Sequence, residues 1–155
     1  MPILGWLAVA GAFAPVVVGL LWARRRLLLV SVVGRSMEPT LRAGDRVLAR
    51  RVPLARVRAG DVVVVRAPAA MTAGRPGLPG EGPGLLIKRA HAVPGDPVPV
   101  QRVPLLRRRG EAVVPAGQLV VLGDNPPFSY DSRECGYIAG SDVLGVVVRP
   151  RRLAR

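Results

Sequence analysis

The chain opens with an apolar run, residues 3–22, that contains no charged side chain. Its length of about 20 residues is what an α-helix needs to cross the hydrocarbon core of a bilayer. Pro2 lies at the start, where a helix tolerates proline, and Pro15 lies inside, where a membrane helix accommodates a kink. Trp6 and Trp22 lie near the two ends, at the depth of the membrane interfaces. The run predicts one N-terminal transmembrane helix; a buried core helix is the alternative.

Three arginines, residues 24–26, end the apolar run. A cleaved signal peptide would begin with basic residues, and none precedes the run. The small-x-small pattern at Ala12 and Ala14 is followed by Pro15, which obstructs cleavage. We therefore expect residues 1–26 to form a membrane anchor that ends in a basic stop. Residues 27–155 are expected to form a separate domain after this anchor. The positive-inside tendency would place the arginine cluster, and with it the domain, on the cytoplasmic side.

The remainder of the chain alternates short apolar runs with turn-forming residues. Only 4% of residues are aromatic, and the 18 glycines and 16 prolines imply many turns. Candidate strands are residues 27–33, 46–51, 61–66, 85–93, 98–102, 119–122 and 143–149. Short strands at this spacing predict an all-β domain. Residues 67–84, rich in glycine and proline, predict an exposed, mobile loop.

A formal net charge of +13 suggests an anionic partner. Anionic lipid headgroups and nucleic-acid phosphates both attract such a chain. The N-terminal run favours the lipid bilayer, and no zinc-finger spacing or helix-turn-helix pattern is visible, so no nucleic acid partner is expected. Cys135 and His91 are the only cysteine and histidine, which excludes an internal disulfide and disfavours a His/Cys metal site.

Lys88 is the single lysine among 23 lysine and arginine residues. Arginine does not lose its proton at ordinary pH, whereas a desolvated lysine does. The apolar residues 85–87 precede Lys88 on a predicted strand. An amine that faces an apolar interior has a lowered pKa, because burial disfavours its charged form. Lys88 is thus a candidate general base; chance in an arginine-rich composition is the alternative.

A general base needs a nucleophile, and Ser36 lies in the turn-like segment GRSMEPTL, residues 34–41. Gly34 permits close backbone approach, and Pro39 stiffens the turn after the serine. Such a turn holds a hydroxyl and nearby backbone N–H donors in fixed relation, as an oxyanion site requires. Simple turn chemistry is the alternative for any serine in a Gly/Pro turn.

Four segments carry a family resemblance. Residues 36–41 (SMEPTL), 60–64 (GDVVV), 88–96 (KRAHAVPGD) and 123–133 (GDNPPFSYDSR, followed by Gly136) resemble, in the same order, the nucleophile box, the next strand, the lysine box and the last box of signal peptidase I. The resemblance covers residues 33–148, and four boxes in order are a specific signal. The chain therefore resembles a short form of the signal peptidase I family, serine proteases with a Ser/Lys dyad.

The resemblance implies a mechanism and a fold. Ser36 would attack the peptide carbonyl, and neutral Lys88 would accept its proton. The fold would be a mainly β, signal-peptidase-like catalytic domain, preceded by one transmembrane helix and resting an apolar face on the bilayer. No cofactor and no metal would be needed.

The resemblance also implies supporting residues around the dyad. Ser129 matches a serine whose hydroxyl orients the lysine amine, and Asp131 with Arg133 matches a charged pair that braces the site. Asp124 and Asn125 belong to the same support.

Some features depart from the family pattern. The backbone N–H of Ser36 would donate to the oxyanion, but Gly34 stands where some members carry a second, hydroxyl donor. The stretch from residue 96 to residue 119 is short, so the accessory β-domain of larger relatives is expected to be reduced to a hairpin or lost. A Cys135–His91 dyad is a further conceivable pair, but neither residue has a motif of its own.

The implied substrates are preproteins or leader peptides, bound as extended strands with small residues at −1 and −3 before the cut. Two shallow apolar pockets near Ser36 would accept them, and Val33 and Met37 are the candidate wall residues. The catalytic domain would lie on the outer (trans) face of the cell membrane, whereas the arginine cluster at residues 24–26 argues for the cytoplasmic face.

Two other functions stay open on the sequence. The first is a specialised protease that matures a single partner, such as nickel superoxide dismutase or a secreted peptide. The second is a basic, membrane-tethered binding module without catalysis, against which the simultaneous presence of Ser36, Lys88, Ser129 and Asp131 argues.

Overall fold

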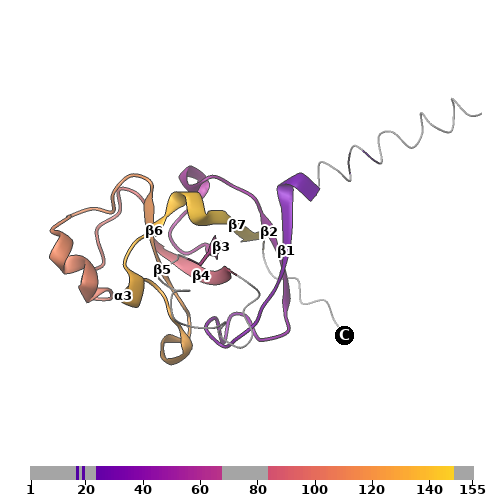
Figure 1. Ribbon diagram of the computed structural model, residues 1–155, viewed down its shortest axis with the longest axis horizontal. Helices are drawn as coiled ribbons and strands as arrows, with labels where there is room; N and C mark the ends of the chain where they lie inside the picture. Colours follow the sequence, from indigo (N-terminus) through magenta and orange to yellow (C-terminus); the bar gives the residue numbers. More distant parts are fainter. Residues whose placement is uncertain (1–16, 18, 20–23, 68–83, 149–155) are drawn as a thin grey trace, which may run out of the picture.

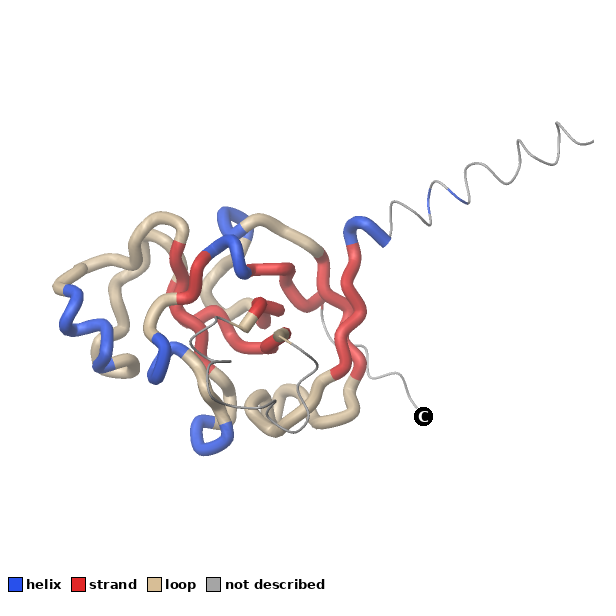
Figure 2. The backbone as a smooth tube through the Cα atoms, viewed as in Figure 1, coloured by secondary structure: helices blue, strands red, loops and turns tan. Residues whose placement is uncertain are grey.

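The computed structural model describes residues 17, 19, 24–67 and 84–148 of the chain. Within these residues, seven strands form one curled, antiparallel sheet in the order β1-β2-β7-β3-β4-β5-β6 (Figures 1 and 2). The strands are β1 (Leu27–Ser31), β2 (Arg46–Arg50), β3 (Val62–Arg66), β4 (Leu85–Ala92), β5 (Gln118–Leu122), β6 (Ile138–Ala139) and β7 (Val143–Val148). The predicted mainly β class is therefore confirmed for the described part of the chain.

Short helical turns lie between the strands from β2 onward. They are the 3-10 helices η1 (Leu54–Arg56), η2 (Pro104–Arg109), η3 (Pro126–Phe128) and η4 (Gly140–Asp142), and the α-helix α3 (Ser132–Cys135). Two of them, η3 and α3, follow β5 and carry residues of the candidate site described below.

The predicted strands agree with the structure except in one place. Valine-rich runs such as β3 form strands because β-branched side chains pack well on a pleated surface. The strand predicted at residues 98–102 is wrong. Pro97 and Pro99 lack the N–H that a ladder requires, and the Arg102 N–H donates to the Pro99 carbonyl in a turn.

The stretch from residue 96 to residue 119 is compact, in keeping with the expectation that an accessory β-domain is reduced here. An isolated antiparallel bridge joins Pro97 to Val113, and η2 lies between them. Val103, Leu106 and Val114 bury themselves in one cluster with Val120 of β5. This excursion extends to the left of the sheet in Figure 1, on the side opposite β1.

Both faces of the central strands are buried because the sheet curls over itself. On β3, Val63 and Val65 belong to one apolar cluster, whereas Val64 between them belongs to another. Strand β4 follows the same alternation, with Leu86 in the first cluster and Ile87 in the second. Side chains in the middle of β4 are therefore enclosed on either face.

Parts of several predictions fall on residues that the structure does not describe. Most of the predicted membrane run (3–22), nearly all of the predicted loop (67–84) and Arg149 at the end of the last predicted strand lie outside the described residues. Among the residues that are described, no helix has the length and apolar character needed to cross a bilayer.

Candidate active site

Lys88 lies in the middle of β4 and is 1% exposed. It pairs directly with Val63 of β3, so both side chains lie on the same face of the sheet. Leu86 and Ala90, two residues away on either side, share that face. The chain's single lysine is thus enclosed by an apolar cluster.

Ser36 lies in the turn that leaves β1 and is 8% exposed. Buried Met37 and Leu41 fasten this turn to the core, and the Leu41 N–H donates to the Met37 carbonyl at 2.9 Å. Gly34 adopts a φ of +83°, and an added Cβ there would meet no atom within 4 Å. Glycine is therefore required by the left-handed backbone and not, as expected, by a close approach.

The loop after β5 holds the Ser36 turn by its backbone. The Asn125 N–H donates to the Ser36 carbonyl at 2.9 Å, and Asn125 Nδ2 donates to the Arg35 carbonyl at 3.0 Å. Two consecutive carbonyls of the turn are thus fixed by one asparagine.

Gly123 is the point at which the site residues converge. A Cβ at Gly123 would lie 2.7 Å from the Ser36 carbonyl oxygen and would overlap the side chain of Ser129. Strand β5 pairs with β4 through Arg89 opposite Leu122 and Ala90 opposite Val121. Continued by one residue, this antiparallel register places Lys88 opposite Gly123. The Ser36 carbonyl and the Ser129 side chain therefore approach Gly123, and the strand that carries Lys88 runs beside the strand that leads into it.

Asp131 is fully buried at the start of α3 and accepts several hydrogen bonds. The Ser129 hydroxyl donates to it at 2.7 Å and the Gly123 N–H at 2.8 Å. Arg133 donates from Nε at 2.9 Å and from Nη2 at 2.7 Å. Glu134 completes a capping box by accepting from the Asp131 N–H, which fixes the carboxylate at the helix start.

The electrostatics of Asp131 follow from these contacts. Burial alone would raise the pKa of this carboxyl, but the hydrogen bonds from Arg133, Gly123 and Ser129 outweigh burial and hold the pKa below its usual value. Asp131 is therefore an anion that can only accept, so the Ser129 hydroxyl must donate to it. The lone pairs of the Ser129 oxygen then remain for a donor.

A second ionic contact joins three parts of the site. Arg89, next to Lys88 on β4, donates to both carboxylate oxygens of Asp124 at 2.7 and 2.6 Å. The Thr40 hydroxyl, in the Ser36 turn, donates to the same carboxylate at 2.5 Å. Burial tends to raise the pKa of Asp124, yet the bonds from Arg89 and Thr40 bring it below its usual value. This network connects β4, the loop after β5 and the nucleophile turn.

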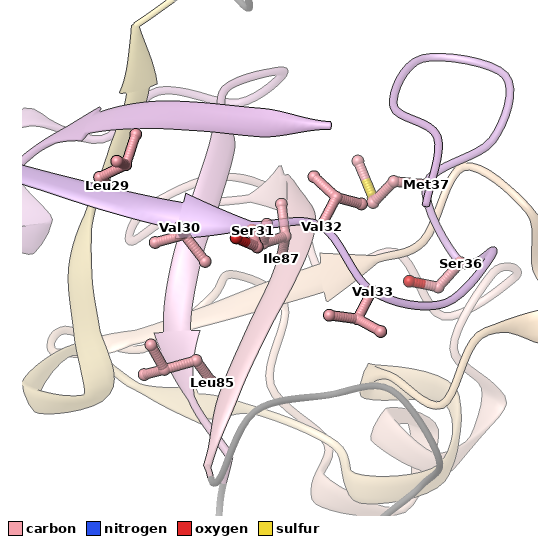
Figure 3. A pocket seen from close by; sticks show the side chains of 9 residues that line it. All are labelled: Leu29, Val30, Ser31, Val32, Val33, Ser36, Met37, Leu85 and Ile87. Carbon is pink, nitrogen blue, oxygen red and sulfur yellow. The ribbon is translucent and has the colours of Figure 1, made fainter. Parts of the chain in front are cut away.

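An apolar cavity of about 240 Å³ adjoins Ser36 (Figure 3). It is lined by Leu29, Val30, Ser31, Val32, Val33, Ser36, Met37, Leu85 and Ile87. β1 and β4 are far apart in the strand order, but both line the cavity because the sheet curls. The two predicted wall residues, Val33 and Met37, are both among the lining side chains.

A larger cavity of about 590 Å³ lies elsewhere. Its lining includes Arg50, Arg56, Arg58 and Asp61 and contains no serine or lysine. Chemistry, and not volume, therefore identifies the smaller cavity as the candidate site.

Cys135 does not offer a competing nucleophile. Burial, together with the negative charges of Asp131 and Glu134, raises the pKa of its thiol to about 11. The Sγ atom donates to the Asp131 carbonyl at 3.1 Å. A protonated thiol is a poor nucleophile, which argues against the Cys135–His91 pair.

The structure gathers the residues predicted to form the site. Contacts at Gly123 and at the Ser36 turn connect Ser36, Ser129, Asp131, Arg133, Asp124 and Asn125, and Lys88 lies buried on β4, the strand beside β5. Sequence reasoning missed Gly123, Arg89 and Thr40. They could have been found by their place inside the matched segments, because Arg89 follows the only lysine and Gly123 begins the last box.

Comparison with known proteins assigns the chain to a family. The sequence profile of the family described as signal peptidase, peptidase S26, matches residues 4–107 and 100–150. Because this match covers most of the chain, the chain belongs to the signal peptidase family, peptidase S26.

Individual relatives are moderately similar. Signal peptidase I of Leptolyngbya laminosa is 29% identical over 135 residues, covering 76% of this chain and 64% of the relative. Thylakoidal processing peptidase 1, chloroplastic, of Arabidopsis thaliana is 29% identical over 152 residues, covering 86% and 44%. Probable signal peptidase I-2 of Synechocystis sp. is 30% identical over 128 residues, covering 71% and 56%. The chain thus spans less than two thirds of the length of each of these relatives.

Proposed function

We propose that this chain is a membrane-anchored endopeptidase that removes leader peptides from preproteins after small residues at −1 and −3. Ser36 is the nucleophile and Lys88 the general base. The observation that carries the proposal is the near-complete burial of Lys88 on β4, beside the strand that leads into Gly123, which packs against the Ser36 carbonyl and the Ser129 side chain. Burial in an apolar cluster penalises the charged form of an amine, and the uncharged form is the one that accepts a proton.

The reaction proceeds through an acyl-enzyme. Ser36 Oγ attacks the carbonyl carbon of the scissile peptide while Lys88 Nζ accepts the hydroxyl proton. Lys88 then gives this proton to the departing amine as the C–N bond breaks. A water molecule, activated by the same amine, hydrolyses the Ser36 ester and releases the leader.

Ser129 acts as a positioning residue in this scheme. Its hydroxyl proton is committed to Asp131, so its oxygen accepts from the Lys88 amine and aims it at Ser36. Asp131 and Arg133 hold Ser129 in turn, and Asp124 and Asn125 hold the Ser36 turn. Supporting groups of this kind keep a reacting pair in productive geometry.

The cavity beside Ser36 accounts for small residues before the cut. Its volume of about 240 Å³ and its mostly aliphatic lining suit short apolar side chains. Among the described strands β1 lies at the edge of the sheet, and an extended substrate lying along it would bond to its outward-facing backbone groups. Alternate substrate side chains, at −1 and −3, would then point into the cavity.

Membrane attachment is part of the proposal. Residues 3–22 form the anchor, residues 24–26 its basic stop, and residues 27–155 the catalytic domain. An exposed apolar row supports contact with lipid: Leu29, Leu48 and Val148 are cross-strand neighbours on β1, β2 and β7 and are 63%, 40% and 48% exposed. Arginines near this row would meet anionic headgroups.

We assign the catalytic domain to the outer (trans) face, where exported preproteins emerge, against the tendency of residues 24–26. Protease protection in sealed, oriented vesicles tests this placement. In vesicles whose outer face is exposed, added protease is expected to digest residues 27–155. Full protection of these residues would contradict the placement.

Cleavage of a preprotein tests the function. The full chain in detergent is incubated with a preprotein that carries a small-x-small leader, and the cut is mapped by mass spectrometry. Cleavage after the second small residue is expected for the wild type and for Ser141→Ala, an exposed serine in η4. Ser36→Ala, Lys88→Arg and Lys88→Met are expected to be inactive, because each lacks the nucleophile or the base.

Lys88→Met keeps the length and the apolar packing of the buried side chain, so circular dichroism is expected to show a folded protein. A folded Lys88→Met variant that still cuts would remove Lys88 from the mechanism.

A further inference from the structure

Arg35 precedes the nucleophile and projects its side chain out of the turn. Its guanidinium lies 4.4 Å from the centroid of the Phe128 ring, and its Nε donates to Glu38 Oε2 at 3.2 Å. The Asn125 amide holds the Arg35 carbonyl, so the backbone beneath the side chain is fixed. The Arg35 side chain is 59% exposed and Phe128 is 55% exposed. A cation therefore lies over an aromatic ring at the surface, one residue before Ser36.

Arg35 differs from the other arginines of the site in how many of its guanidinium nitrogens make hydrogen bonds. Arg89 binds Asp124 through two nitrogens, and Arg133 binds the buried Asp131 in the same way. Within the described residues, both terminal nitrogens of Arg35 make no hydrogen bond, and only Nε is engaged. Its exposed pair with Glu38 is weak, because solvent screens such pairs. The outer edge of the guanidinium remains open to a ligand.

The position of Arg35 decides which part of a substrate it meets. Figure 3 shows Ser36 near one end of the cavity-lining side chains and Leu29 at the other. A peptide whose leader side occupies the cavity must leave at the Ser36 end. Arg35 and Phe128 are outside the cavity lining but adjoin Ser36 and Ser129 along the chain. The residues that follow the scissile bond therefore pass over this pair.

We infer that Arg35, held on the Phe128 ring, is a specificity residue that binds a carboxylate in the first two residues of the mature chain, on the far side of the cut. This inference rests on the proposed peptidase function and adds a second determinant to the small leader residues. A guanidinium binds a carboxylate through two parallel N–H donors. The aromatic face keeps the guanidinium plane oriented while its edge contacts the substrate. A lysine at the same substrate position is repelled.

Matched peptides test the inference. Each carries the same small-x-small leader, with Asp, Ala or Lys at the first or second mature position. The readout is the ratio of kcat/KM for the Asp peptide to that for the Lys peptide. We expect a ratio of about ten in the wild type, because a weak attraction of Asp and a weak repulsion of Lys both favour the Asp peptide. Arg35→Gln brings the ratio near one, and Arg35→Glu inverts it. Glu38→Gln raises it, because Glu38 competes for the same cation.

Two controls separate this contact from the overall positive charge. Arg107→Gln removes the same charge from exposed η2 and is expected to keep the wild-type ratio. A peptide with its Asp moved to the far end of the leader has the same net charge and is expected to lose the preference. Equal ratios in the wild type and Arg35→Gln, with cleavage intact, would overturn the inference alone. The absence of cleavage of every peptide by the wild type would overturn the proposed function as well.

Discussion

Gly123 is a glycine because Ser36 and Ser129 approach it too closely for any side chain. The space that a Cβ would need is occupied by the Ser36 carbonyl and the Ser129 side chain. By contrast, glycines such as Gly117 have open surroundings and are required by a positive φ, here +76°. The two kinds of glycine should respond differently to the same substitution.

Gly123→Ala is expected to separate Ser36 from Ser129 and to lower kcat/KM for leader cleavage by at least about 100-fold, since small displacements of reacting groups cost rate steeply. Overpacking should also lower the free energy of unfolding by about 1–3 kcal/mol. Urea unfolding and a cleavage assay measure the two effects.

Gly117→Ala serves as the matched control. Its positive φ makes it lose about 1 kcal/mol of stability, but it lies away from the serines and should keep its activity. Equal activity of the two variants would show that close packing at Gly123 does not hold the site together.

At the scale of elements, β4 contributes two adjacent basic residues with opposite tasks. Lys88 points into the apolar cluster, whereas Arg89 reaches Asp124 and approaches Thr40 at the surface of the site. The alternation of a strand produces this division without any irregular backbone. One strand thereby supplies the proposed base and, through Arg89, contacts the turn that carries the proposed nucleophile.

A double-mutant cycle measures the fastening contact. Arg89→Gln and Asp124→Asn are expected to show a coupling of about 1 kcal/mol in urea unfolding, because the pair is bidentate and Thr40 also binds it. The control is the pair of Arg66 and Asp142, 3.9 Å apart and more exposed, for which about 0–0.5 kcal/mol is expected. Equal coupling in both pairs would mean that the network adds nothing beyond an ordinary surface ion pair.

The short helix α3 connects stability to pH through its first residue. The pKa of Asp131 is lower in the folded chain than in the unfolded chain, so folding releases protons from this group. Its contribution to stability is complete above the unfolded value, near 4, and is lost as the pH falls through the folded value.

Asp131→Asn is therefore expected to be less stable than the wild type at pH 7 and to show a shallower decline below about pH 4. Urea unfolding at a series of pH values measures both slopes. Parallel curves for the two proteins would contradict the assignment of this acid sensitivity to Asp131.

At the scale of the whole molecule, the features that depend on local sequence could be predicted, whereas those that depend on long-range contacts could not. Runs of β-branched residues predicted most strands, because strand formation there depends on neighbours along the chain. The insertion of β7 between β2 and β3 could not be predicted, since it depends on contacts between distant segments. The two-residue strand β6 is too short to leave a pattern.

The site divides in the same way. The matched segments indicated Ser36 and Lys88, but not the contacts that bring them together. Thr40 and Asp124 are 84 positions apart, and Arg35 and Asn125 are 90 apart. Such contacts follow from the curl of the sheet and not from local sequence, which is why the Arg35–Phe128 pair emerged only from the structure.

The protonation state of Lys88 tests the central claim most directly. Because Lys88 is the only lysine, labelling lysine with ¹⁵N at Nζ gives a single side-chain signal in the full chain. We expect the resonance of a neutral amine at pH 8 in the folded protein and of a charged ammonium after unfolding at the same pH. A charged ammonium in the folded, active enzyme up to pH 10 would contradict it.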